Sequence, residues 1–169
     1  MIEKQSPLSM ANLIVDIAIK NDKPISNLHL QKTLYFVQAF FLVKTGKPII
    51  DGTFSRWPYG PIIKEVYYAF NKYGASEITE PVTIQDFPFE EIEIEEISTN
   101  VFSKYEDEVK QFVIKLINRT PWDLVEITHK QSIWANFEKE ILKYEAPDYT
   151  NSEIEMEFKN NEEYQLWNL

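Results

Sequence analysis

Cysteine is absent from the 169-residue sequence, and histidine occurs only at positions 29 and 129. The lack of cysteine excludes disulfide bonds and thiolate metal sites. The two histidines lie about a hundred residues apart and form no His-x-x-x-His pair, so the sequence shows no zinc-binding pattern. We therefore expect neither a metal nor another cofactor.

Glycine is also scarce. The four glycines stand at positions 46, 52, 60 and 74, and no two of them are closer than six residues. This spacing excludes a phosphate-binding loop and a dinucleotide-binding fingerprint, and no G-x-S-x-G nucleophile elbow occurs. The glutamates at positions 90–96 lie beside alternating isoleucines, which is typical of a solvated face rather than of a catalytic pair. These patterns identify no catalytic residue, and they leave enzymatic activity open.

Long apolar runs are lacking too. The densest, Leu34–Val43, is about half the length that a membrane-spanning helix needs. The N-terminal residues do not show the basic patch, apolar region and cleavage site of a secretory signal. We expect a cytoplasmic protein without a membrane segment.

Basic residues are few, and their distribution is uneven. The net charge is −10; residues 1–74 hold nine Lys/Arg and five Asp/Glu, whereas residues 75–169 hold eight and twenty-two. Because nucleic-acid binding depends on Lys/Arg contacts with phosphates, nucleic acid is not an expected partner. The acidic surface suits a basic protein partner, or serves only to keep the protein in solution.

What the sequence does contain is typical of a globular, mainly helical protein, since 44% of residues are hydrophobic and 14% aromatic. Apolar residues recur at helical spacing over most of the chain, with capping residues at the ends. The expected helices cover Ser9 to about Lys20, Ser26 to Gly46, Pro61 to Gly74, Ser103 to about Arg119, Thr120 to about Lys130, SIWANFEKEIL, and a C-terminal helix from Thr150. Ser103 with Glu106 and Thr150 with Glu153 match the capping-box pattern. We predict a mainly α, compact multi-helix single domain over residues 1–169, with a small extended element or short hairpin.

Residues 75–99 differ from the rest, because they form a Glu-rich insert with alternating isoleucines. The stretch EIEIEEIS is consistent with an edge strand, isoleucines inward and glutamates outward. It is also consistent with a helix, since glutamate favours helices.

The stretch RWPYGPIIKEVY, residues 56–67, combines two prolines and a glycine with bulky aromatic residues. Each proline disfavours helix in the residue before it, so Trp57 and Gly60 are expected to be extended. Pro61 suits the first position of a helix, with Gly60 as its N-cap, which predicts a strand-to-helix corner. The helix start is then a candidate site for an anion or a partner's carboxylate, and the alternative is a rigid corner whose aromatic residues fill the core.

His129 is the second residue considered for a role. On a helix it shares a face with Trp122 and Val125, and Trp134 follows closely. A histidine at such a position is more often a hydrogen-bonded core residue than a titrating functional group.

Four stretches of the chain carry a resemblance to a known family. LHLQKTLYFVQAFFLVKTGKPI, FSRWPYGPIIKEVYYAFNKYG, PWDLVEITHKQSIW and TNSEIEMEF resemble the conserved blocks of the SocA-like, phage-associated Panacea antitoxin domain. The likeness covers about residues 9 to 160. THKQSIW lacks the proline usual after that TH, and the Glu-rich residues 86–97 have no counterpart.

The resemblance implies a non-enzymatic antitoxin of a toxin–antitoxin system, which binds and neutralises a cognate toxin. In one branch of the family the antitoxin is a proteolytic adaptor that delivers its toxin to a AAA+ protease, a second expected partner. The alternatives are a phage- or prophage-borne regulator that binds a host protein, or a small-molecule-binding enzyme. The partner-binding residues carried over from the matching blocks are Gln31, Lys32, Tyr35, Trp57, Tyr59, Gly60, Pro61, His129 and Trp134.

Overall fold

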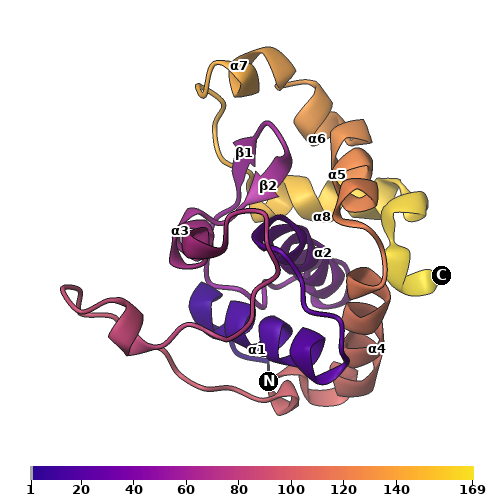
Figure 1. Ribbon diagram of the computed structural model, residues 1–169. Helices are drawn as coiled ribbons and strands as arrows, with labels where there is room; N and C mark the ends of the chain where they lie inside the picture. The colour runs from indigo at the N-terminus through magenta and orange to yellow at the C-terminus, as the bar shows by residue number, and fades with distance from the viewer. Residues whose placement is uncertain (1) are drawn as a thin grey trace.

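Helix α2, Asn27–Thr45, runs through the middle of the molecule (Figure 1). The structure is a computed structural model that describes residues 2–169. The predicted caps are present: the Ser26 hydroxyl accepts a hydrogen bond from the amide of His29, and Gly46 ends the helix with a left-handed φ of 72°. Fifteen of its nineteen residues are buried, and its last two turns are apolar nearly all round, which is typical of a central helix.

The other helices of the described chain complete a mainly α fold, as predicted. They are α1 (Pro7–Lys20), α3 (Lys64–Ala69), α4 (Glu106–Ile117), α5 (Pro121–Lys130), α6 (Ser132–Ala135), α7 (Glu138–Leu142) and α8 (Asn151–Asn160). Helices α1, α4, α5 and α8 pack against α2. Strands β1 (Ser55–Trp57) and β2 (Gly60–Ile62) form one antiparallel hairpin. Within residues 2–169, every helix is too short or too polar to cross a membrane.

Aromatic side chains on α2 bring distant segments of the chain together. The ring of Phe36 packs edge-on against Phe158 of α8, with 5.6 Å between centroids. Phe40 meets Trp167 near the C-terminus at 5.4 Å. Burying a large apolar side chain contributes roughly 1.5–3 kcal/mol, so these contacts fix the later helices around α2. The hairpin is attached to the same core.

The prediction of a helix beginning at Pro61 is wrong. Gly60 and Pro61 lie in strand β2, where they pair with Trp57 and Arg56, and helix α3 begins only at Lys64. Gly60 has a φ of 99°, which is outside the range of a helix N-cap. The candidate anion site at that helix start is therefore absent from the described chain, and Pro58 and Tyr59 form a two-residue turn instead.

The predicted capping box at Ser103 is also wrong, although the one at Thr150 and Glu153 is confirmed. Ser103 has a left-handed φ of 51°, and α4 begins at Glu106. The Glu106 carboxylate accepts a hydrogen bond from the Thr99 hydroxyl at 2.6 Å instead of capping the helix. Thr99, which lies outside the predicted motif, is thus the partner of Glu106 in place of Ser103.

The predicted helix SIWANFEKEIL is divided into α6 and α7. The break falls at Asn136 and Phe137, and the ring of Phe137 packs on the guanidinium of Arg56, 4.0 Å from its centroid. A contact with the hairpin therefore overrides the local helical pattern.

The Glu-rich insert leaves the helical body as an arm (Figure 1). We call residues 77–97 the acidic arm. Its stretch Glu91–Ile97 is neither strand nor helix, and its backbone forms no hydrogen bond with any of residues 2–169. Ile92, Ile94 and Ile97 are partly buried and the glutamates between them are exposed. The predicted alternation is therefore present, but no strand lies alongside it.

Candidate functional site

Three side chains from two regions of the sequence hold the hairpin by its backbone carbonyl oxygens. We call Lys32, His129 and Trp134 the carbonyl clamp. Lys32 Nζ donates to Pro61 O at 2.9 Å, His129 Nε2 to Pro58 O at 2.8 Å, and Trp134 Nε1 to Trp57 O at 3.0 Å. Each of these hydrogen bonds pairs a buried or partly buried carbonyl, which would otherwise cost free energy by being left unpaired. The clamp brings together most of the residues that the family resemblance had selected.

Two further selected residues of α2 are buried beneath the hairpin. The side-chain oxygen Oε1 of Gln31 accepts a hydrogen bond from the backbone amide of Ile63, directly after β2, at 2.9 Å. The Tyr35 hydroxyl donates to the Gln131 side chain at 2.6 Å, and its ring packs edge-on against Phe54, directly before β1. Burial raises the pKa of Tyr35 well above its usual value, so the hydroxyl keeps its proton. Both residues therefore stabilise the fold and are closed to a partner.

Gly60 allows the hairpin to approach the clamp closely. A Cβ at this position would lie 2.6 Å from Thr128 Oγ1 and 3.0 Å from Lys32 Cε. Its φ of 99° is in addition one that residues with side chains rarely adopt. Glycine is therefore required here by both backbone conformation and space.

Lys32 is fully buried, and no carboxylate pairs with it in the described chain. Burial lowers the pKa of its amine from 10.5 to about 7. A charged ammonium without a counter-ion is costly in the interior, and the neutral amine still donates to Pro61. The residue is thus a hydrogen-bond donor within the fold.

His129 stacks on Trp134 with 3.9 Å between ring centroids. Burial lowers the pKa of His129, a backbone hydrogen bond to Pro58 acts in the opposite direction, and nearby Lys32 lowers it further. Because a carbonyl can only accept, Nε2 carries the proton in this contact. A neutral, hydrogen-bonded ring matches the core interpretation of this histidine.

Arg56 is the most extensively bonded residue of the hairpin, and the sequence reasoning missed it. Its guanidinium lies between the rings of Phe137 and Tyr149, at 4.0 and 4.4 Å from their centroids. It donates to three carbonyls and one carboxylate: Ile133 O at 2.6 Å, Pro147 O at 2.9 Å, Asp148 O at 3.0 Å and Glu153 Oε1 at 2.8 Å. Arg56 thereby joins β1 to the start of α6, to the loop before α8, and to α8 itself.

A signal for Arg56 was present in the sequence. The chain has only two arginines, and this one stands between Phe54 and Trp57 in an otherwise apolar stretch. Arginine in such a position is suited to planar, multidentate bonding and to stacking on aromatic rings.

The exposed part of the hairpin is aromatic. Tyr59, in the turn, is 58% exposed and meets Trp122 of α5, 57% exposed, edge to face with 5.4 Å between centroids. We call these two residues the turn pair. On β1, the half-buried Trp57 packs against Tyr67 of α3 at 5.0 Å. Of the nine residues selected from the sequence, Tyr59 is exposed, Trp57 and His129 are partly exposed, and the other six are buried.

The arrangement offers a rigid, partly apolar contact surface. The donors that an enzyme would direct at a substrate are instead occupied by backbone carbonyls. Residues 2–169 contain no group of three or more histidine, aspartate or glutamate side chains placed to hold a metal ion.

The sequence model of a family described as "Antitoxin SocA-like, Panacea domain" matches residues 30–135, which include most of α2, the hairpin and all three clamp residues. The chain belongs to this antitoxin family. Antitoxin SocA of Caulobacter vibrioides (strain NA1000 / CB15N) is 46% identical to this chain over 70 residues. That stretch is 41% of this chain and 37% of the length of the relative. No solved structure matches the chain.

Three of the four blocks that carried the resemblance contain the carbonyl clamp and the hairpin, and the fourth lies at α8. The family pattern therefore records in large part how the hairpin is built.

Proposed function

We propose that this protein is the antitoxin of a toxin–antitoxin system, and that it neutralises its toxin by binding it directly through the turn pair. The observation that supports this best is the exposure of Tyr59, in the turn of a hairpin that several side chains hold in place, and of Trp122 beside it on α5. Membership of an antitoxin family supports the general role. We further propose that residues 1–169 form one Panacea domain with 75–99 as an insert.

Tyrosine and tryptophan are the residues that most often dominate binding energy at protein interfaces. Their cost on binding falls when they are already fixed, because less side-chain and loop freedom is lost. The clamp fixes the backbone on both sides of Tyr59, and Trp122 supports its ring. The turn pair is therefore a preorganised anchor of the kind that stoichiometric inhibition requires.

Co-expression with the protein encoded by the neighbouring gene tests the proposal. We expect this protein to restore growth, and Tyr59→Ala/Trp122→Ala to lose most of that rescue with its melting temperature kept. Met156→Ala on α8, which also removes an exposed apolar side chain (60% exposed), is the matched control and should rescue fully. Binding of purified proteins should weaken by at least about a hundredfold, the loss of two anchors at about 1.4 kcal/mol or more each.

Absence of rescue by the unaltered protein would overturn the antitoxin assignment for that pair of genes. Rescue by the doubly substituted protein as strong as by the Met156→Ala control would instead overturn the role of the turn pair. A neighbouring gene that encodes no growth inhibitor would favour the alternative of a regulator that binds a host protein.

Delivery to a AAA+ protease stays a prediction from the family resemblance. The half-life of the toxin in cells distinguishes the two routes, because simple binding leaves it unchanged or longer, whereas delivery shortens it.

A further inference from the structure

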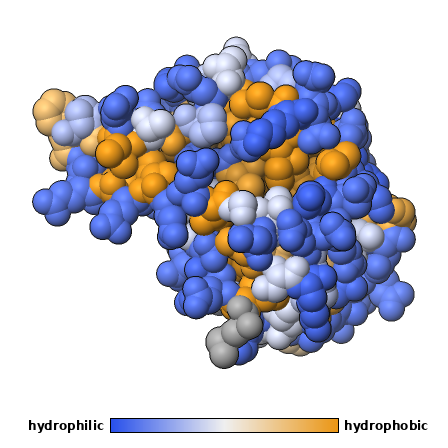
Figure 2. All heavy atoms as spheres, turned by 90° about the horizontal axis from the view of Figure 1, so that it is seen from below, coloured by the Kyte–Doolittle hydropathy of each residue, from blue (hydrophilic) through white to orange (hydrophobic). Residues whose placement is uncertain are grey.

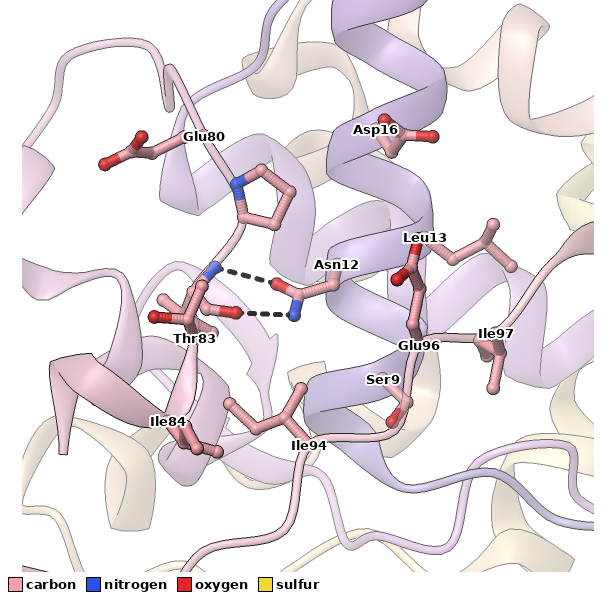
Figure 3. Close-up of a pocket in the computed structure, with 12 residues that line it drawn as sticks. Ser9, Asn12, Leu13, Asp16, Glu80, Thr83, Ile84, Ile94, Glu96 and Ile97 are labelled. Carbon is pink, nitrogen blue, oxygen red and sulfur yellow. Dashed lines mark hydrogen bonds between the residues drawn. The ribbon is translucent and has the colours of Figure 1, made fainter.

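A groove of about 520 Å³ lies between the acidic arm and α1 (Figure 3). Helix α1 forms one side through Ser9, Asn12, Leu13 and Asp16. The two limbs of the arm form the others, the outgoing limb with residues 80–84 and the returning limb with Ile94, Glu96 and Ile97. The volume is within the range of sites that bind ligands or short segments of partners.

The outgoing limb is fixed to α1, whereas the returning limb is not. Asn12 Nδ2 donates to Val82 O at 2.9 Å, and Asn12 Oδ1 accepts the amide of Val82 at 3.0 Å, as drawn in Figure 3. Over Glu91–Ile97, by contrast, the backbone has no hydrogen-bond partner among residues 2–169. An extended stretch with unpaired N–H and C=O groups is a template for an added strand.

The side chains around the groove determine what kind of strand fits. Ile84 and Phe89 on the arm are 61% and 98% exposed, and Figure 2 shows hydrophobic side chains over the arm. At the rim, Asp16 is paired with Lys20, whereas Glu80 and Glu96 form no ion pair in the described chain. From residue 73 to 103 the sequence has eight Asp/Glu and no Lys/Arg.

This combination of apolar and acidic groups selects one class of occupant. Nucleic acid, an anionic membrane surface and the acidic arm of a second copy would all be repelled by the arm. A basic polypeptide would be attracted, and its apolar residues would cover the exposed ones of the arm.

We propose that an extended, basic segment of a partner protein adds as a β-strand to Glu91–Ile97. Alternate apolar side chains of that segment enter the groove, and its Lys or Arg side chains face Glu80, Glu96 and the exposed glutamates. That the segment belongs to the toxin rests on the proposed function; the strand site itself does not.

The test uses a short labelled peptide in which lysine alternates with valine, and fluorescence anisotropy with the full chain. We expect it to bind, with affinity falling as ionic strength is raised from about 0.01 M to about 0.15 M, where screening shortens the reach of charges from about 30 to about 8 Å. A peptide alternating glutamate with valine should not bind. A peptide of the same lysine and valine residues arranged in two blocks should bind at least about tenfold more weakly, because it cannot present one apolar face as a strand.

Backbone pairing is tested separately from charge. Glu95→Pro/Glu96→Pro removes one N–H on each edge of the segment, and Glu95→Gln/Glu96→Gln removes the same two charges only. Neither N–H is hydrogen-bonded within the described chain, so both variants should melt as the unaltered protein does. We expect the proline variant to bind the peptide at least about tenfold more weakly than the glutamine variant.

Strand addition would be overturned if the proline and glutamine variants bound the peptide equally well. It would also be overturned if the unaltered protein bound the alternating and block peptides equally well. Four charge reversals remote from the arm, Glu140→Lys/Glu145→Lys/Glu162→Lys/Glu163→Lys, serve as a control for net charge and should leave much of the binding. With purified toxin, loss of binding by the proline variant alone supports the toxin as the protein that supplies the added strand. Toxin binding equal in the proline and glutamine variants overturns that source, and no binding by any form is the failure of the proposed function instead.

Discussion

At the scale of single residues, Lys32 was selected from the family resemblance as a partner-binding residue, but its side chain bonds within the core. Its amine is fully buried and bonded to Pro61 O, in a region where a charged group has no counter-ion. Burial lowers the pKa of Lys32 to about 7, whereas in the unfolded chain it is near 10.5. The unfolded chain therefore holds more protons than the folded one between these two values, and stability should rise with pH across that interval.

Lys32→Met should remove this dependence. We expect the free energy of unfolding of the unaltered protein to rise by an amount on the order of a few kcal/mol between pH about 7 and about 10, and that of the variant to stay nearly level. Urea unfolding at several pH values measures both slopes. Burial raises the pKa of Tyr35 and Tyr149, which lowers stability only above pH about 10, so the interval is free of their titration. Parallel slopes in the two proteins would contradict a neutral buried amine.

Gly60 gives a second prediction at this scale. Gly60→Ala should reduce the free energy of unfolding by about 2–4 kcal/mol, because it adds a contact with Thr128 to a strained φ. Gly74→Ala is the matched control: its φ is 54°, but nothing lies within 4 Å of an added Cβ. We expect the control to cost about 1 kcal/mol. If urea unfolding gives the two variants the same loss, the close approach to Thr128 has no energetic effect.

At the scale of elements, the β1–β2 hairpin is joined to the C-terminal third of the chain by Arg56. Arg56→Met leaves three carbonyls without a donor and removes the ion pair with Glu153. We therefore expect the free energy of unfolding to fall by about 3 kcal/mol or more. Because Glu153 is partly exposed, Glu153→Gln should cost only about 1 kcal/mol. Arg119→Met, at the other arginine, should change stability little. Thermal unfolding compares the three, and limited proteolysis should show cleavage between residues 143 and 149 in the Arg56 variant alone.

The helices were predictable from the sequence where their ends are encoded locally. Ser26 and Gly46 bound α2 as expected, and Thr120 caps α5. Failures occurred where a distant contact decides the conformation. Gly60 is a strand residue because the clamp approaches it, and Phe137 ends α6 because it stacks on Arg56, some eighty residues earlier in the chain. Neither contact leaves a periodic pattern in the sequence.

The sequence indicated several residues that gather at the hairpin, but it missed Arg56 and did not predict which of these residues are exposed. The family resemblance selected residues that do gather at the hairpin, and it included Tyr59. It gave no indication that Gln31, Lys32 and Tyr35 are fully buried, or that Trp122 supports Tyr59. Exposure depends on which face of α2 and α5 meets the hairpin, and α2, whose last two turns are apolar nearly all round, does not specify that face.

At the scale of the whole molecule, the acidic arm lies apart from the hairpin, although acidic residues also occur at the hairpin, where Glu153 bonds to Arg56. The acidic arm extends from the helical body beside α1, whereas the hairpin lies in the upper part of Figure 1, between α3 and α7. The turn pair and the groove therefore face different surroundings, one aromatic and rigid, the other acidic with a free backbone edge. A partner that contacts both would have to reach across the body of the domain, and separate loss of each contact would show whether it does.

The hydrogen bonds of the carbonyl clamp do not depend on the side chain in the turn of the hairpin. Lys32, His129 and Trp134 bond to main-chain oxygens of Pro61, Pro58 and Trp57, which every amino acid possesses. The side chain at position 59 takes no part in these bonds. If the turn pair binds the toxin, as proposed, exchange of the side chain at position 59 changes the toxin that is recognised and leaves these bonds in place.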